Sequence, residues 1–294
     1  MKIKRSLSEN VFDIFNVILL ILIAIVMLYP MWYVLCASFS DSNKLVAHEG
    51  IMITPLDLNI SAYEKVFANP MIIKGYINTI LYVVIGTVIN MVLTIIGGYC
   101  TSLKNVYWSG AMMKFMTFTM FFSGGLIPMY LLVVRTLDLG DTIWALLLPG
   151  AISTYNLIII RTGFASIPDT LIEAAKLDGA THLQIIVKIV VPLSKATIAV
   201  IALYYIVGHW NSWFPAAIYL DTRTKFPLQL VLREILLQNS TDSMAGNVSA
   251  ADQYSVGESI KYGVIVVATV PILIVYPYLQ KYFTKGVMIG AVKG

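Results

Sequence analysis

Charged side chains are scarce in this sequence of 294 residues, because Asp, Glu, Lys and Arg together make up only 12% of it. A soluble domain usually carries about 25%. Apolar residues reach 58%, and several apolar runs have roughly the 20 residues that a helix needs to cross a bilayer. The alternating pattern of a membrane β-barrel is missing. The composition therefore excludes a soluble domain and predicts an all-α integral membrane protein.

Residues that carry chemistry are also few. The sequence holds two Cys and three scattered His, without the spacing of a metal site. It has no GxxxxGK[ST] phosphate loop, so we do not expect the chain to hydrolyse ATP itself. No run of basic residues suggests a nucleic-acid partner. We predict no catalytic residue, no metal site and no cofactor bound by this chain.

The two cysteines are not expected to form a disulfide. Cys36 lies near one end of the first predicted span and Cys100 near the far end of the second. Antiparallel spans would place the two thiols on opposite sides of the membrane, beyond the reach of a disulfide. The first apolar run, 17–36, is longer than the roughly 7–15 residues of a signal-peptide core, so we interpret it as an uncleaved span.

The apolar runs predict six spans within a single transmembrane domain, 1–294. Their bounds are about 12–38, 76–101, 111–134, 142–161, 196–218 and 262–283. An even number of spans places both termini on one side. That side carries 12 of the 20 basic residues, namely Lys2, Lys4, Arg5, Lys104, Lys114, Arg161, Lys176, Lys188, Lys195, Lys281, Lys285 and Lys293. The positive-inside rule then predicts that both termini are cytoplasmic.

Two long loops lie on the predicted outer side, 40–75 and 219–261. The second loop contains an amphipathic segment, 226–238. Its apolar residues at helical spacing are Leu228, Val231, Leu232, Ile235 and Leu236. The sequence leaves open whether this helix lies on the membrane surface, caps the bundle or docks a partner. The stretch 239–257 is rich in Ser, Asn, Asp, Ala and Gly and is predicted to be a loop.

Proline interrupts most of the predicted spans. The prolines concerned are Pro30, Pro128, Pro149, Pro215, Pro271 and Pro277. Each removes a backbone donor, and neighbouring groups must replace the lost hydrogen bond. Membrane helices tolerate such residues in general, so the pattern fits ordinary spans as well as bent helices around a passage.

The segment Ser166–Leu193, between the fourth and fifth predicted spans, is an unusually polar cytoplasmic turn. Pro168 suits the first turn of a helix, and Thr170 and Glu173 have the spacing of a capping box. Gly179 can adopt the left-handed conformation that ends a helix.

Helix then resumes toward Pro192, because Thr181 and Gln184 have the spacing of a second capping box. The whole segment is predicted to be helix, tight bend, helix. Such a rigid elbow would transmit a force on its tip to the fourth and fifth spans.

The elbow also carries a spaced motif: Glu173-Ala174-Ala175, three residues, Gly179, nine residues, Ile189, two residues, Pro192. This motif resembles the EAA loop of the permease subunits of binding-protein-dependent ABC importers. Val191 replaces the family's usual Leu, a mild departure. The string IPDTLIEAAKLDGA and the C-terminal KGVMIGAVKG resemble the maltose-permease type, and FSGGLIPMYLL (121–132) resembles a subgroup assigned to complex oligosaccharides.

This resemblance implies the type I importer permease fold, with 166–193 as its cytoplasmic coupling loop. It implies the following ATPase-coupling residues: Glu173, Ala174, Ala175, Asp178, Gly179, Ile189 and Pro192. The implied partners are an ATPase dimer that binds ATP and magnesium, a second and different permease, an extracellular solute-binding protein, an oligosaccharide and the lipid of the bacterial cell membrane. Alternating access would move the sugar.

The resemblance also implies that the outer loop reaches the binding protein. Its candidate residues are Asn239, Ser240, Asn247 and Tyr254.

Aromatic and polar side chains gather late in the fifth predicted span and in the fourth. We name as candidates for the sugar path His209, Trp210, Asn211, Trp213, Tyr155 and Asn156. Trp and Tyr also anchor helices at membrane interfaces, whereas polar groups inside a span usually face the interior, so both interpretations stay open. For Asn78, Thr79 and Asn90 in the second span we favour ties between helices. Arg161 is expected to mark the inner interface.

A secondary transporter or a membrane sensor is the alternative function. A secondary transporter should carry charged residues inside its spans, and the predicted spans hold almost none. A sensor should carry a soluble signalling domain, for which little sequence remains. The importer permease is therefore the favoured hypothesis.

Overall fold

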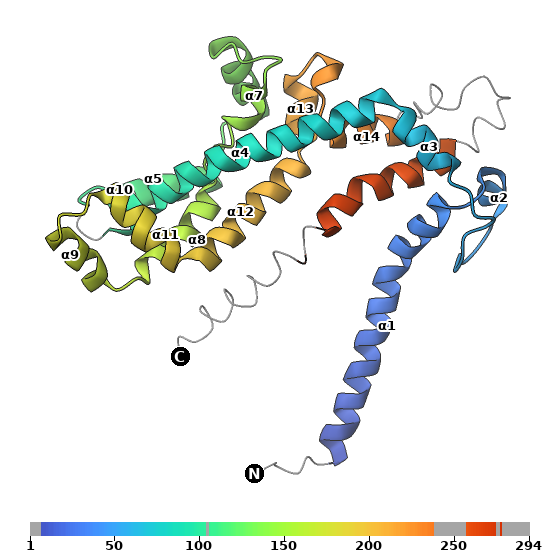
Figure 1. The fold of residues 1–294 in the computed structure, drawn as a ribbon, viewed down its shortest axis with the longest axis horizontal. Coiled ribbons are helices and arrows are strands. Elements are labelled where there is room, and N and C mark those ends of the chain that lie inside the picture. Colours follow the sequence, from blue (N-terminus) through green and yellow to red (C-terminus); the bar gives the residue numbers. More distant parts are fainter. Residues whose placement is uncertain (1–6, 104–105, 238–256, 275–276, 278–294) are drawn as a thin grey trace. The chain divides into compact units, whose positions relative to one another are not determined.

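A computed structural model of the chain describes residues 7–103, 106–237, 257–274 and 277 (Figure 1). Within these residues the protein is helical, with a single isolated bridge between Ser40 and Leu58 and no β-strand. The fold divides into two compact units: residues 1–70 with 234–269, and residues 71–233 with 270–294. Each unit is described by itself below.

The first unit begins with α1 (Leu7–Ser38), whose apolar side chains are exposed over most of its length. After α1 the chain forms α2 (Ser42–Ala47) and α3 (Ser61–Ala68), so the predicted outer loop 40–75 contains two short helices. A small core joins the end of α1 to α2 through Cys36, Ala37, Leu45 and Met52. The apolar helix Gly257–Ile274, drawn in red in Figure 1, packs on α3, where Gly263 lies against Ala62 and Val66.

The second unit is arranged along α4 (Pro70–Ser102). The buried face of α4 repeats every three or four residues and contains mostly small or polar side chains, including Gly75, Thr79, Gly86, Asn90, Thr94 and Gly98. In a membrane, small residues let helix backbones approach closely, and polar side chains bond across the contact. A Cβ added at Gly98 would lie 2.4 Å from Ile160 Cγ2 on α8, so this contact requires glycine.

The remaining helices of the second unit are short and often bent. They are α5 (Ser109–Phe121), α6 (Leu126–Tyr130), the π-helix η1 (Leu131–Thr136), α7 (Ile143–Leu147), α8 (Thr154–Ala165), α9 (Asp169–Leu177), α10 (His182–Ile185), the π-helix η2 (Ile186–Val190), α11 (Val191–Leu193), α12 (Lys195–Trp210), α13 (Phe214–Tyr219), the 3₁₀-helix η3 (Arg223–Lys225) and α14 (Leu228–Leu237). The main core of this unit is formed by Tyr99, Ile160, Phe164, Ile167, Ile185, Ile186, Val190, Ile201 and Tyr205. It joins α4, α8 and α12 to the elbow.

Three of the predicted spans are interrupted. The third bends by 115° between α5 and α6 at the Gly124-Gly125 pair, where Gly125 has φ +87°. The fourth divides into α7 and α8 around Pro149 and Gly150, and the fifth breaks between α12 and α13, just before Pro215. Three described helices are long and apolar enough to cross a membrane, or five if each bent pair forms one span, so the count of six stays a prediction.

The amphipathic outer segment is helical as predicted. In α14, Leu228, Val231, Leu232 and Ile235 are buried. The helix begins against α4, because the Leu228 backbone N–H donates to Thr79 Oγ1 at 2.8 Å. Asn78 Nδ2 donates to the carbonyls of Thr224 and Phe226, and Tyr82 Oη to that of Lys225. The start of α14 and the turn before it therefore cap one end of α4.

Candidate functional site

The elbow of Ser166–Leu193 lies at the opposite end of α4 from α14 (Figure 1). Its first helix, α9, begins at Asp169, so the predicted helix is present, but Pro168 occupies the cap position and not the first turn. The capping box expected for Thr170 and Glu173 is wrong, because the cap position is Pro168 and no side chain caps the helix. The second capping box is confirmed: Gln184 N–H donates to Thr181 Oγ1, and Thr181 N–H donates to Gln184 Oε1.

The bend at Gly179 is a complete helix-ending motif. The glycine has φ +77°, its N–H donates to the Lys176 carbonyl at 3.1 Å, and Ala180 N–H donates to the Ala175 carbonyl at 2.9 Å. These two bonds are those of a Schellman motif. The two alanines, 175 and 180, also pack against the core. The predicted left-handed glycine is confirmed, and the bend is fixed by the backbone.

The motif residues of α9 are divided between core and solvent. Ile172 and Ala175 pack toward the core, whereas Glu173, Ala174 and Asp178 are exposed. Leu177, at the tip, exposes 89% of its surface.

The second arm of the elbow contains Ile189 and Pro192. Ile189 lies in the π-helix η2 and is half-buried, and Pro192 lies in α11. Proline cannot donate to the carbonyl four residues earlier and its ring crowds that carbonyl, so a widened turn before it relieves both problems. At Ser194 the direction changes by 90° into α12. The elbow thus continues into the fifth predicted span through a second bend.

Two polar contacts join this region to the C-terminal end of α4. Tyr99 Oη and His182 Nδ1 lie 2.8 Å apart, and Arg161 Nε donates to the Thr101 carbonyl at 2.9 Å. Tyr99 is 2% exposed and also belongs to the core. The Tyr99–His182 pair could not be predicted from the sequence, because the two residues are 83 positions apart.

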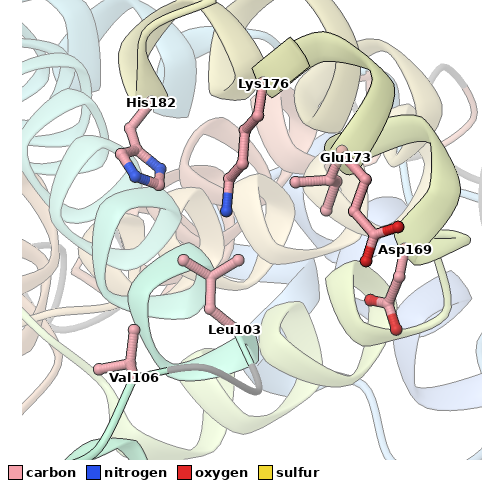
Figure 2. Close-up of a pocket in the computed structure, with 7 residues that line it drawn as sticks. Leu103, Val106, Asp169, Glu173, Lys176 and His182 are labelled. Atoms are coloured by element: carbon pink, nitrogen blue, oxygen red, sulfur yellow. The ribbon is translucent and has the colours of Figure 1, made fainter.

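A recess of ≈250 Å³ lies under α9 (Figure 2). It is lined by Leu103, Val106, Asp169, Ile172, Glu173, Lys176 and His182. Figure 2 shows the Lys176 side chain and the His182 ring on one side and the carboxyl groups of Glu173 and Asp169 on the other. The predicted coupling residue Glu173 therefore faces a mixed-charge surface and not a closed catalytic cleft.

The candidate path residues fall into three groups. His209 and Trp210 pack on α4: His209 Nε2 donates to Asn90 Oδ1 at 2.6 Å, and the Trp210 ring meets Tyr76 edge-on at 6.2 Å. Asn90 Nδ2 also donates to the carbonyls of Gly150 and Ala151, at 2.9 and 2.8 Å. Asn90 thus links α4 to α12 and to the break before α8 by hydrogen bonds, in agreement with the prediction that it joins helices.

The second group lies at the break after α12. Asn211 is exposed and donates to the Val207 carbonyl, and Trp213 lies under the guanidinium of Arg233. The third group lies near the start of α8, where Tyr155 is exposed beside Tyr204 and Asn156 is buried. Among the described residues, no hydrogen bond or ring contact links the three groups, and a common sugar path along the six residues stays a prediction. The predicted binding-protein residues Asn239, Ser240, Asn247 and Tyr254, and the C-terminal KGVMIGAVKG, lie outside the described residues.

At the other end of α4 a polar corner holds the turn before α7 to the turn after α13. Asp141 accepts hydrogen bonds from Lys225 Nζ, from the Thr222 hydroxyl and from the backbone N–H groups of Asp221 and Thr222. These donors favour the charged carboxylate, and Lys225 first among them holds the pKa of Asp141 well below its usual range. Sequence reasoning did not single out this corner.

Comparison with known proteins shows the family to which the chain belongs. Residues 93–289 match the family described as binding-protein-dependent transport system inner membrane component. The chain is 39% identical to the polygalacturonan/rhamnogalacturonan transport system permease protein YtcP of Bacillus subtilis (strain 168), over 98% of this chain and 100% of that protein. It is also 39% identical to protein LplC of the same organism, over 98% of this chain and 96% of that protein.

A solved structure shares the fold. It belongs to a bacterial ABC transporter involved in the import of the acidic polysaccharide alginate, with a TM-score of 0.86, 32% identity and coverage of 96% of this chain and 100% of that chain. The importer-permease fold and the family inferred from the EAA loop are thereby confirmed. The chain belongs to the binding-protein-dependent transport system inner membrane component family and is a transport subunit, not an enzyme.

Proposed function

We propose that this chain is one of two permease subunits of an ATP-driven importer for oligosaccharides in the bacterial cell membrane, with both termini in the cytoplasm. A separate ATPase dimer binds ATP and magnesium, and an extracellular binding protein delivers the sugar. The second permease is a different chain. The observation that carries this proposal is the elbow: a tip fixed by a Schellman bend, exposed at Leu177 and anchored to α4, α8 and α12.

The mechanism follows from that anchoring. When the ATPase closes on ATP, it pushes the exposed face of α9. Because the bend at Gly179 is held by backbone hydrogen bonds, the elbow moves as a body. The buried cluster and the Tyr99–His182 contact pass the displacement to three helices at once, and the path changes from inward-open to outward-open.

Acidic oligosaccharides are the sugar class that we favour. The relative YtcP is named for polygalacturonan and rhamnogalacturonan, and the solved relative imports alginate. All three polymers contain uronic acids. Relatives at lower identity are named for maltodextrin, arabinooligosaccharides and galactooligosaccharides, so the family includes importers of neutral sugars as well.

The substitution Gly179→Val tests the coupling role. Nothing lies within 4 Å of a Cβ at this position, so the effect arises from the positive φ alone, which costs a branched residue about 1–2 kcal/mol. We expect ATP-dependent uptake to fall and the ATPase to co-purify poorly. Gly50→Val is the matched control, because Gly50 also has positive φ (+114°) and open space but lies in the first unit. Full uptake and full ATPase recovery with Gly179→Val would refute the proposal.

A further inference from the structure

A cation and an aromatic ring are stacked at the end of the second unit opposite the elbow. The guanidinium carbon of Arg233 lies 3.6 Å from the centroid of the Trp213 ring. Trp213 follows α12, and Arg233 is exposed on α14. The Phe214 ring meets Trp213 edge-on at 5.4 Å and is 43% exposed.

Both partners of this stack are held by packing. On the Arg233 side, a Cβ added at Gly75 of α4 would lie 3.1 Å from the Leu228 backbone, so α14 packs closely on α4. On the Trp213 side, the preceding residues His209 and Trp210 are fixed against α4. The guanidinium plane is thus positioned before any ligand arrives, which lowers the entropic cost of binding.

The charge of Arg233 is not neutralised within the described part of the chain, where no carboxylate lies within salt-bridge distance of it. The carboxylate of Asp141, in the same unit, is already paired with Lys225 at 2.6 Å. Because Trp213 covers one face of the guanidinium, its N–H groups around the edge remain available to an outside acceptor. A guanidinium fork matches a carboxylate with two parallel hydrogen bonds.

We propose that Arg233, stacked on Trp213, binds the carboxylate of a uronic acid residue as the oligosaccharide enters from the outer side. The exposed ring of Phe214 offers an apolar face to the same sugar. This inference rests on the proposed function and deepens it, because it assigns the carboxylate recognition of an acidic sugar to a residue of this chain. It also answers a physical difficulty: the predicted spans carry almost no fixed positive charge, so an acidic substrate needs a cation at the entrance.

The test uses the complete importer, with its ATPase, second permease and binding protein, in proteoliposomes. Uptake of trigalacturonate is compared with uptake of its trimethyl ester, in which a methyl group on each of the three carboxyls removes the negative charge. Arg233→Gln should raise the KM for trigalacturonate roughly tenfold, the value of one charge-assisted bond, and change that for the ester less than twofold. Trp213→Leu should raise the KM for the acid by a smaller factor, because the guanidinium keeps its charge but loses the aromatic ring on which it stacks.

Arg135→Gln is the matched control, since Arg135 is exposed in the same unit and contacts no aromatic ring among the described residues. It should change neither KM. Equal effects of Arg233→Gln on acid and ester, no effect on the acid, or weaker capture of the binding protein in a pull-down would each overturn the assignment. A wild-type importer that moves the ester and not the acid would also overturn it. If wild type moves no oligosaccharide on ATP addition, the proposed function itself fails.

Discussion

Tyr99 of α4 and His182 of α10 share a hydrogen bond of 2.8 Å, although α4 belongs to the second predicted span and α10 to the elbow between the fourth and fifth. The elbow is therefore joined to a helix that is not adjacent to it in sequence. A displacement of the elbow that kept this bond would move α4 together with α8 and α12.

Tyr99→Phe is expected to uncouple ATP hydrolysis from uptake in part. The ring remains in the core, so folding and expression should be unchanged, while the bond to His182, typically about 1 kcal/mol, is lost. We expect more ATP hydrolysed per sugar imported. Tyr107→Phe is the control, because Tyr107 is 91% exposed. An unchanged ratio in Tyr99→Phe would show that the hydrogen bond has no part in coupling.

Gly86→Ala should destabilise the second unit. A Cβ at Gly86 would lie 2.5 Å from His209 Nε2 and 2.9 Å from Leu147 Cδ2, so the His209 ring, which is bonded to Asn90, and the Leu147 side chain would have to shift. Such overpacking costs about 1–3 kcal/mol. The thermal midpoint of the purified complex should fall. Gly208→Ala is the matched control in α12, since nothing lies within 4 Å of its Cβ, and helix propensity predicts an equal or higher midpoint. Equal midpoints for the two variants would contradict the close approach at Gly86.

The Asp141 corner should make stability depend on pH. Its pKa is depressed in the folded state, above all by Lys225, so the carboxylate contributes stability that is complete above the ordinary Asp pKa of about 3.9. That contribution declines as the pH falls below this value toward the folded pKa. Asp141→Asn should therefore lower the thermal midpoint at pH 7, and its difference from wild type should shrink below about pH 4. Thermal melts of the two proteins between pH 3 and 7 would measure these midpoints.

Asp138→Asn provides the control for that series. Asp138 lies on the same turn and also has positive φ (+51°), but it accepts none of the bonds that reach Asp141. Its substitution should leave the midpoint unchanged at every pH. If the difference in thermal midpoint between wild type and Asp141→Asn stayed constant from pH 7 to pH 3, the charge of Asp141 would not be the cause of that difference.

The local features of the elbow could be predicted from the sequence because they depend on nearby residues. The left-handed Gly179 and the Thr181–Gln184 capping box are each decided within about five residues. The Thr170–Glu173 box failed for the same kind of reason: Pro168 already occupies the cap, with its φ fixed near the helical value, and the helix begins one residue before Thr170.

The long-range contacts could not be predicted in this way. The contacts of Asp141 with Lys225 and of Arg233 with Trp213 each join two separate segments of the chain, and the sequence around one residue does not identify the other. The spans are predicted from their apolar length. The breaks at 122–125 and 148–153 are marked in the sequence only by Gly and Pro, which membrane helices also tolerate unbroken. Where a helix bends is decided by the neighbours that accept its freed backbone groups.

Asn90 should contribute more to stability than His209, although both were considered from sequence for their polarity. Asn90 bonds to His209 and to two backbone carbonyls at the break before α8, whereas His209 makes one of these bonds. Asn90→Ala removes the partner of three part-buried polar groups, and His209→Ala removes the partner of one, at up to about 1 kcal/mol for each lost bond. The thermal midpoint should therefore fall further in Asn90→Ala.

Because Asn90 and His209 share a hydrogen bond, the double variant should lose less stability than the sum of the losses in the two single variants. If His209→Ala lowers uptake at unchanged midpoint, His209 serves the sugar path, and the interpretation of this pair as a structural tie is wrong.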